Sequence, residues 1–180
     1  MPVPGMRPLR DCGDIPLRID AFGQWLYRGS PIRRKEMVCL FASTLVRGTD
    51  GSYWLVTPME QARIQVDDVP FLAVELFHDG GCGEEQVLSV RTNVDEIVTI
   101  DAQHPLRIAH DPETGEPRPY VTVRPGLEAR LTRSVYYHLA ARAIERCQGS
   151  TTCCGVWSRG TFFRLGCYDE AGRVVGSPDD

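Results

Sequence analysis

The chain of 180 residues is 42% hydrophobic and 24% charged, which is typical of a globular protein with one ordinary domain or two small ones. Its formal net charge of −4 argues against general binding of nucleic acid, which needs a broad cationic face. The chain begins without the apolar core of a signal peptide, and its apolar stretches are far shorter than the ~20 residues of a membrane helix. We therefore expect a cytoplasmic protein.

The first half of the chain predicts a hairpin, a helix and then strands. Leu17 and Ile19 share one face of an alternating segment, and a Gly-containing turn leads into a second strand that ends at Arg28. Ser30 and Pro31 favour the start of a helix, as its capping residue and a first-turn residue. Further strands are expected over Tyr53–Val56, Arg63–Val66, Phe71–Phe77, Val87–Thr92 and Ile97–Ile100.

The second half predicts a similar series. Leu106 and Ile108 again share a face, a polar loop follows, and Tyr120–Arg124 alternates. A helix is expected from about Thr132 to Cys147, because apolar side chains recur there every four residues. The closing strands are expected over Val156–Trp157 and Thr161–Leu165.

The tetrapeptide Pro-Leu-Arg-Ile occurs twice, at Pro16–Ile19 and at Pro105–Ile108. A four-residue match is weak alone, but the ordered matches after each copy favour an internal duplication. We predict an α+β fold of two tandem, related β-sheet-plus-helix units. Its parts are an N-terminal extension at 1–14, a first unit at 15–92, a second unit at 93–175 and a frayed tail at 176–180.

Arginines recur where strands lead into the two predicted helices. Cations at a helix start oppose the helix dipole, by about 0.3–1 kcal/mol each when exposed, so they call for a compensating anion. That anion is either a carboxylate of the fold, such as Glu60, Asp67 or Asp68, or a bound phosphate. The plainer alternative is a solvated face with arginine stems on apolar surface. The expected anion-binding residues are Arg28, Ser30, Arg33, Arg34, Arg124 and Arg133.

A second group of polar residues flanks or faces the predicted seam between the units. Each has an ordinary structural explanation, such as the shaping of a turn by an Asn or a hydrogen-bonded structural His. If the seam binds a ligand, these residues would supply its polar contacts. They are Asn93, His104, Arg107, Tyr120 and Arg63.

The seven cysteines are an odd number, which fits reduced thiols better than a disulfide framework. A zinc site would have to use Cys147, Cys153, Cys154 and Cys167, with or without His138. No Cys-x-x-Cys pair or common finger spacing is present, so we expect neither a metal nor a cofactor. The vicinal pair Cys153 and Cys154 is an alternative redox-sensitive site.

Common enzyme signatures are missing. The chain contains no phosphate-binding loop, no His-Glu-x-x-His and no Gly-x-Ser-x-Gly elbow. We therefore expect no catalytic residues.

Several strings together resemble a bacterial family, domain of unknown function 1285. They are Trp25–Ile32, Asp50–Pro58, Arg91–Asn93, His104–Arg107 and Pro119–Ala129, and the likeness spans roughly Ile15 to Gly166. The resemblance implies a duplicated α+β architecture whose second unit is loosely similar to pleckstrin-homology-like folds. It also implies a polar site between the units for a nucleotide-like ligand, and a role in signal transduction or stress response.

We thus expect a non-enzymatic protein that binds a small anionic, nucleotide-type ligand at the interface of two duplicated units. No nucleic-acid polymer or membrane is expected as a partner, and a protein partner stays open. One alternative is a pleckstrin-like module for proteins or peptides, which predicts an exposed apolar groove. Another is a nucleotide-processing enzyme, which would need a metal-binding pair of carboxylates.

Overall fold

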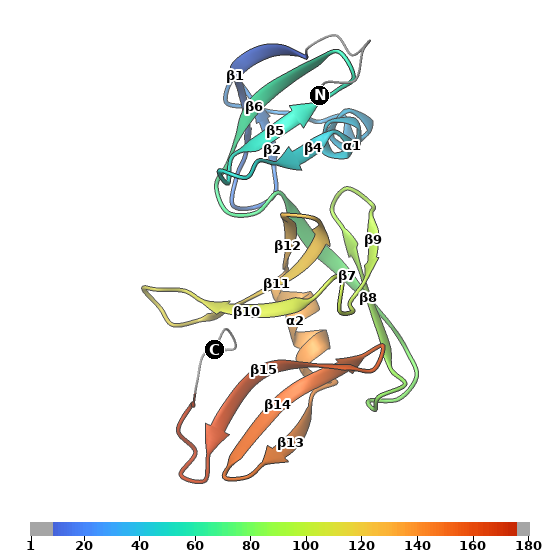
Figure 1. The fold of residues 1–180 in the computed structure, drawn as a ribbon, viewed down its shortest axis with the longest axis vertical. Coiled ribbons are helices and arrows are strands. Elements are labelled where there is room, and N and C mark those ends of the chain that lie inside the picture. Colours follow the sequence, from blue (N-terminus) through green and yellow to red (C-terminus); the bar gives the residue numbers. More distant parts are fainter. Residues whose placement is uncertain (1–8, 176–180) are drawn as a thin grey trace, which may run out of the picture. The chain divides into compact units, whose positions relative to one another are not determined.

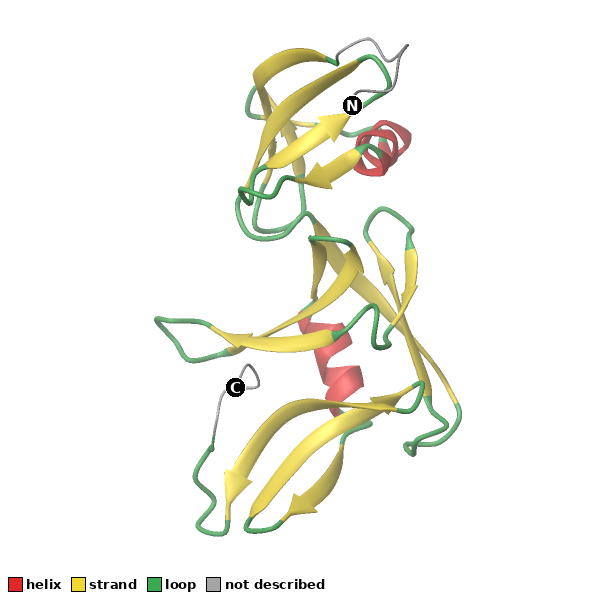
Figure 2. Cartoon of the chain, viewed as in Figure 1, coloured by secondary structure: helices red, strands yellow, loops and turns green. Residues whose placement is uncertain are grey.

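The structure, a computed structural model, describes residues 9–175. Over this range the chain is mostly β-strand, with two short helices, and it divides into two compact units between Pro70 and Phe71 (Figures 1 and 2). The predicted tail at 176–180 and residues 1–8 of the predicted extension lie outside the described residues. Neither helix within 9–175 is long and apolar enough to cross a bilayer.

The first unit is one six-stranded sheet with a helix. The sheet order is β3-β2-β1-β6-β5-β4, with β1 and β6 paired in parallel at the centre and the other neighbours antiparallel. The elements are β1 (Arg10–Ile19), β2 (Trp25–Tyr27), β3 (Ser30–Pro31), α1 (Lys35–Ser43), β4 (Leu45–Arg47), β5 (Tyr53–Val56) and β6 (Glu60–Val66).

The second unit combines a six-stranded sheet, a helix and a three-stranded sheet. The larger sheet has the order β10-β11-β12-β7-β8-β9, with β12 and β7 parallel, and the smaller one has the order β13-β14-β15. The elements are β7 (Phe71–Asp79), β8 (Val87–Thr92), β9 (Ile97–Thr99), β10 (Leu106–His110), β11 (Pro117–Arg124), β12 (Leu127–Leu131), α2 (Arg133–Ala140), β13 (Ile144–Gln148), β14 (Thr151–Ser158) and β15 (Thr161–Asp169).

The two units contain the same series of elements. In both, three strands precede the helix and three follow it, from β1 to β6 and from β10 to β15. The first and last strands of the series pair in the first unit, and β10 lies against β15 in the second. The second unit carries β7, β8 and β9 in addition. This order is consistent with the predicted α+β fold and with two similar units.

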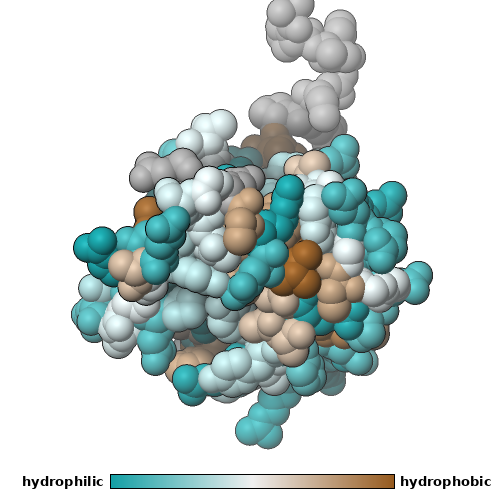
Figure 3. Space-filling view, turned by 90° about the horizontal axis from the view of Figure 1, so that it is seen from below, coloured by the Kyte–Doolittle hydropathy of each residue, from teal (hydrophilic) through white to brown (hydrophobic). Residues whose placement is uncertain are grey.

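Alternating apolar positions give each unit its own core. Leu17, Ile19 and Trp25 are buried in the first unit, and the Trp25 ring stacks on Phe41 with centroids 6.2 Å apart. Phe71 and Ile108 are fully buried in the second. On the face seen in Figure 3, hydrophobic side chains form small patches among hydrophilic ones. Most of the large apolar side chains therefore serve the two interiors.

The boundary between the units lies earlier than the sequence predicts. The structure places it between Pro70 and Phe71, not after residue 92. The reason is the parallel pairing of β7 with β12, in which Phe71 lies opposite Ala129. Pairing between segments so far apart leaves no local signal in the sequence. In addition, β1 begins at Arg10, so residues 10–14 form strand rather than an extension.

The first helix begins later than predicted. Arg28 and Gly29 both adopt left-handed backbone, with φ of 49° and 78°, and form a tight turn that places Ser30 opposite Tyr27. Ser30 is therefore a strand residue and caps no helix. The N-cap of α1 is Arg34, without a side-chain capping bond, so Arg33 and Arg34 precede the helix.

The second helix is shorter than predicted. The spacing of Val135, Leu139, Ala143 and Cys147 predicts four turns, but only Val135 and Leu139 are buried residues of α2. The chain leaves the helix after Ala140, and β13 pairs with β14 as a hairpin. Strand pairing overrides the helical periodicity of this segment.

The expectation of reduced cysteines is wrong for one pair. Cys153 and Cys167 lie opposite each other on β14 and β15 and form a disulfide. The zinc alternative therefore loses two of its four thiols. Within residues 9–175, no group of three His, Cys, Asp or Glu side chains is placed to hold a metal.

A buried hydroxyl links β14 to the larger sheet of the second unit. Ser158 Oγ accepts a hydrogen bond from the Leu88 N–H at 3.0 Å and donates to the Ile100 carbonyl at 2.5 Å. Beside it, buried Gln86 donates to the Trp157 carbonyl at 2.7 Å. These bonds satisfy polar groups where no water reaches them.

Replacing Ser158 by Ala is expected to destabilise the protein by about 1–3 kcal/mol, because it leaves a buried donor and a buried acceptor unpaired. Urea unfolding followed by circular dichroism measures the change. The matched control is Ser150→Ala at an exposed turn, for which little change is expected. Equal stability of the two variants would contradict this role of Ser158.

Candidate functional site

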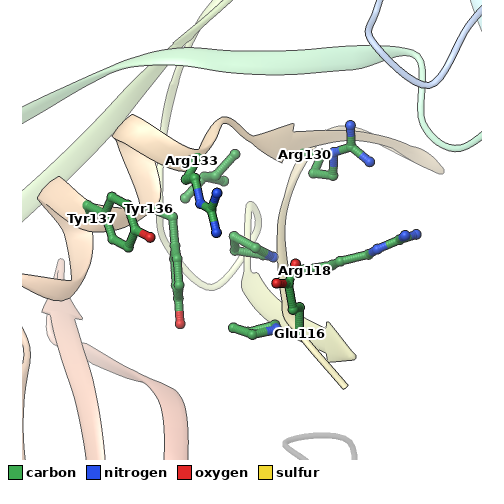
Figure 4. Close-up of a pocket in the computed structure, with 9 residues that line it drawn as sticks. Glu116, Arg118, Arg130, Arg133, Tyr136 and Tyr137 are labelled. Carbon is green, nitrogen blue, oxygen red and sulfur yellow. The ribbon is translucent and has the colours of Figure 1, made fainter. Parts of the chain in front are cut away.

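A cavity of about 280 Å³ lies in the second unit, where α2 begins beside β11 and β12 (Figure 4). It combines cationic and aromatic side chains, as sites for anionic ligands with a ring often do. Its lining residues are Glu116, Pro117, Arg118, Pro119, Arg130, Leu131, Arg133, Tyr136 and Tyr137.

Strand alternation and helix periodicity bring these residues together. Leu127, Ala129 and Leu131 of β12 are buried, so Arg130 points away from that face. Thr132 has extended backbone and ends the strand, which makes Arg133 the first residue of α2. One turn later on the same side of the helix come Tyr136 and Tyr137, because Val135 and Leu139 occupy its buried side.

The view in Figure 4 separates the cavity into two parts. Arg133 and Tyr136 project from α2 towards Glu116, which directly precedes β11, whereas the ends of Arg118 and Arg130 extend away from the helix. The Arg133 guanidinium lies 5.9 Å from the ring centroid of Tyr137. The part next to α2 thus contains one guanidinium, two phenol rings and one carboxylate.

The electrostatics of the cavity rim depend on Asp111. Its carboxylate forms an ion pair with Arg118 and accepts hydrogen bonds from the N–H groups of Glu113 and Thr114 at 2.8 and 3.0 Å. The backbone N–H groups, with the Arg118 charge, hold the pKa of Asp111 below its ordinary value. Asp111 therefore stays ionised and keeps Arg118 in place.

Tyr136 remains a hydrogen-bond donor at neutral pH. Its burial, and more weakly Cys154, raises the pKa of the phenol above its ordinary value. A protonated phenol that faces the cavity can donate to the oxygen of an anion.

None of the site residues predicted in the first unit lines this cavity. Arg63 donates to both oxygens of Asp14, at 2.5 and 2.8 Å. The Arg28 guanidinium lies over the Tyr27 ring, 5.4 Å from its centroid. Ser30, Arg33 and Arg34 are exposed on or after β3.

The carboxylates expected to compensate these cations have other roles. Asp67 receives two hydrogen bonds from Arg18, at 2.8 and 2.6 Å, and this contact lowers the pKa of Asp67. Glu60 accepts a hydrogen bond from the Cys12 thiol. The predicted compensation of the helix-start arginines by Asp67 or Glu60 is therefore wrong.

The polar residues predicted around the seam make contacts within the second unit, except for Arg63, which belongs to the first unit. Arg107 donates to both oxygens of Glu128 at 2.7 Å and lies 4.4 Å from the centroid of the buried Tyr120 ring. Arg124, which was predicted to bind the anion, lies 3.5 Å from a Glu96 oxygen and over the Phe71 ring. These contacts fix the strands of the larger sheet.

Two further predicted residues stabilise turns. Asn93 Oδ1 accepts a hydrogen bond from the Leu72 N–H, and the Asn93 N–H donates to the Leu72 carbonyl. His104 Nδ1 and the His104 N–H both contact Asp101 Oδ1, at 3.1 and 2.9 Å. Both arrangements explain these residues without a ligand.

Of the residues predicted to bind an anion, Arg133 alone lines the cavity. Arg118, Arg130, Tyr136 and Tyr137 also line the cavity and were not among the predicted site residues. The spacing of an arginine and two aromatic residues three and four positions later was a usable signal, since these share one face of a helix. The sequence around Arg118 gives no comparable indication, because the position of Arg118 beside the cavity depends on how β11 pairs with its neighbouring strands.

These observations define a two-unit, mostly β protein that repeats a three-strand, helix, three-strand series and has a cationic and aromatic cavity in its second unit. Family models match along almost the whole chain: the N-terminal domain of unknown function DUF1285 over residues 1–69, and the C-terminal domain of the protein of unknown function DUF1285 over residues 70–165. The chain belongs to the DUF1285 family, as its sequence resemblance indicates. The border between the two family domains agrees with the border between the two units.

Two solved structures of the family are similar to this one. A DUF1285 family protein from Silicibacter pomeroyi DSS-3 is 40% identical with a TM-score of 0.78, over 91% of this chain and 89% of that one. A DUF1285 family protein from Shewanella baltica OS155 is 27% identical with a TM-score of 0.54, over 71% of this chain and 92% of that one. No curated protein matches the chain.

The state of Asp111 predicts a pH dependence of stability. The pKa of Asp111 is lower in the folded protein than in the unfolded chain. The stabilisation is therefore complete above the unfolded value of about 3.9 and is lost as pH falls through the folded value. We expect Asp111→Asn to be less stable than the wild type at neutral pH and to lose less stability between pH 5 and 3.

Urea midpoints measured across this pH range test the expectation. The control is Glu113→Gln in the same exposed turn, whose backbone N–H still reaches Asp111. An acid dependence of Asp111→Asn as steep as that of the wild type would show that Asp111 contributes nothing to it.

Proposed function

We propose that the protein is a non-enzymatic binding protein for a small anionic ligand of nucleotide type. The site is the cavity at the start of α2, rather than the seam between units that the sequence suggests. The observation that carries the proposal is the convergence of Arg133, Tyr136 and Tyr137 on a cavity that Arg118 and Arg130 also line.

The chemistry of the lining residues fits a phosphate and a ring. A guanidinium binds phosphate oxygens with two parallel hydrogen bonds. The Arg133 end of α2 adds free N–H groups and a partial positive charge. The phenol of Tyr136 can donate one further hydrogen bond, and a tyrosine ring offers a stacking surface for a planar base.

The size and charge of the cavity limit the ligand. A volume of about 280 Å³ is at the small end for organic ligands and fits one phosphate with part of a nucleoside. Glu116 on the opposite side opposes a second phosphate next to it. We therefore favour a monophosphate group at this site.

We further propose how the two units arose and what the protein does in the cell. Two related units arose by duplication of one series, and the second unit is loosely similar to pleckstrin-homology-like folds. The protein acts in the cytoplasm, where ligand binding shifts the arrangement of its units and carries a signal, as in a stress response. The shared element order of β1–β6 and β10–β15 supports the duplication.

A thermal-shift screen with inorganic phosphate, nucleotides, dinucleotides and coenzyme A tests the proposal. A ligand at ~100 times its dissociation constant stabilises by about 2.7 kcal/mol, which raises Tm by about 5–10 °C for a chain of this size. We expect at least one phosphate compound to produce such a shift. If none does, the proposal is wrong.

The variant Arg133→Gln locates the site. It is expected to abolish most of the ligand-induced shift while leaving Tm without ligand nearly unchanged, because Arg133 is exposed. Arg164→Gln, at an exposed position of β15, is the matched control and should respond to ligand as the wild type does. A full shift in Arg133→Gln would place the ligand elsewhere.

A further inference from the structure

The first unit contains a continuous apolar groove beside α1. It consists of two adjoining cavities of about 340 and 260 Å³, which share Ile15, Phe41 and Leu55. The larger one is also lined by Cys12, Leu40, Thr44, Thr57, Glu60, Gln61 and Ala62, and the smaller one by Leu17, Tyr27, Ile32 and Met37. All of these residues belong to the first unit.

The helix beside the groove is only partly covered by its own unit. Of the residues of α1, Ala42 alone is buried. Leu40 is 64% exposed and Met37 is 41% exposed, although both are large and apolar. By contrast, α2 buries both Val135 and Leu139. The face of α1 that lines the groove therefore keeps apolar surface in contact with water, at a cost that a partner would remove.

Charge distinguishes the two ends of the groove. At the end formed by Tyr27, Ile32 and Met37, the adjoining charged residues are cationic except for Glu36, which directly precedes Met37. Arg28 lies over the Tyr27 ring, and Arg33 and Arg34 directly follow Ile32 and are exposed. The opposite end contains Glu60. An occupant that complements both ends would carry carboxylates at one end only.

We propose that this groove binds a segment of a protein partner in which large apolar side chains are followed or preceded by acidic residues. The apolar side chains enter the two cavities, and the carboxylates meet Arg28, Arg33 and Arg34. A hollow lined by apolar side chains suits inserted side chains, whereas a membrane surface requires protruding ones. The proposal concerns the first unit and is independent of the ligand proposed for the second.

A random-peptide library displayed on phage and selected on the full chain tests the proposal. Selection on Leu40→Glu in parallel removes peptides that bind elsewhere. We expect the remaining peptides to combine large apolar residues with a net negative charge at one end. Fluorescence anisotropy of a synthetic peptide of that kind then gives its affinity for the wild type and for each variant.

Two kinds of variant separate the apolar and the charged contributions. Leu40→Glu and Met37→Glu are expected to weaken peptide binding about tenfold or more, since each places a charge in the groove. Arg33→Glu combined with Arg34→Glu should weaken it about tenfold at low salt and less at high salt. The matched control is Phe22→Glu, which changes an exposed apolar residue of the same unit outside the groove and should bind as the wild type.

Several outcomes would overturn the proposal. One is selection of the same peptides by the wild type and by Leu40→Glu, and another is a consensus that is neutral or basic. A dimer in sedimentation velocity that dissociates in Leu40→Glu would assign the groove to a second copy of the chain. Leu40-dependent cosedimentation with vesicles of anionic phospholipid would assign it to a membrane. Folding of each variant is checked by its Tm, and Met37→Glu provides the test if Leu40→Glu is unstable.

Discussion

The parallel pairing of β12 with β7 determines how the second unit is built. It joins the start of that unit to a strand more than fifty residues later and places Leu131 opposite Ala73. The ladder extends one residue further, because the Thr132 N–H donates to the Ala73 carbonyl at 3.0 Å. Since Thr132 directly precedes α2, this bond sets where the helix begins and hence where Arg133 and Tyr136 face. Without this hydrogen bond, the start of α2, which lines the cavity beside β11, would not be held in position.

The two helices occupy equivalent places in the element order but serve their units differently. α2 has two buried apolar residues and presents an arginine and two tyrosines to a cavity. α1 buries Ala42 and leaves Leu40 and Met37 beside an apolar groove. A repeated scaffold can thus acquire different surfaces through a few residues on one helix. Function is a property of those residues rather than of the fold that they share.

The sequence was informative where local periodicity decides the structure. The strand Val87–Thr92 has the predicted bounds, because alternation of apolar and polar residues signals a half-buried strand. The strand Tyr53–Val56 also has the predicted bounds, because a short run of aromatic and β-branched residues between turn residues signals a strand. The sequence was misleading where strand pairing overrides the local preference of a residue for a helix. Ser30 and Pro31 are good helix-start residues, yet the turn at Arg28 and Gly29 commits them to β3.

The same distinction applies to the candidate site. Arg133 was predictable from its position beside a helix start, which is a local feature. The roles of Arg63 and Arg107 were not, because their partners Asp14 and Glu128 are distant in sequence and meet them only through strand register. Three of the seven arginines chosen from the sequence, Arg63, Arg107 and Arg124, form ion pairs within their own units. An arginine that leads into a helix is therefore a weaker indication of a ligand than a cavity that collects several of them.

The disulfide between Cys153 and Cys167 limits local unfolding of the β14–β15 hairpin. Its two residues are 14 positions apart and already lie opposite each other in the β14–β15 hairpin. The bond therefore closes a short loop within one hairpin and restrains no other part of the fold. Fraying that begins at the C-terminal end of β15 therefore stops at Cys167, where β15 stays joined to β14.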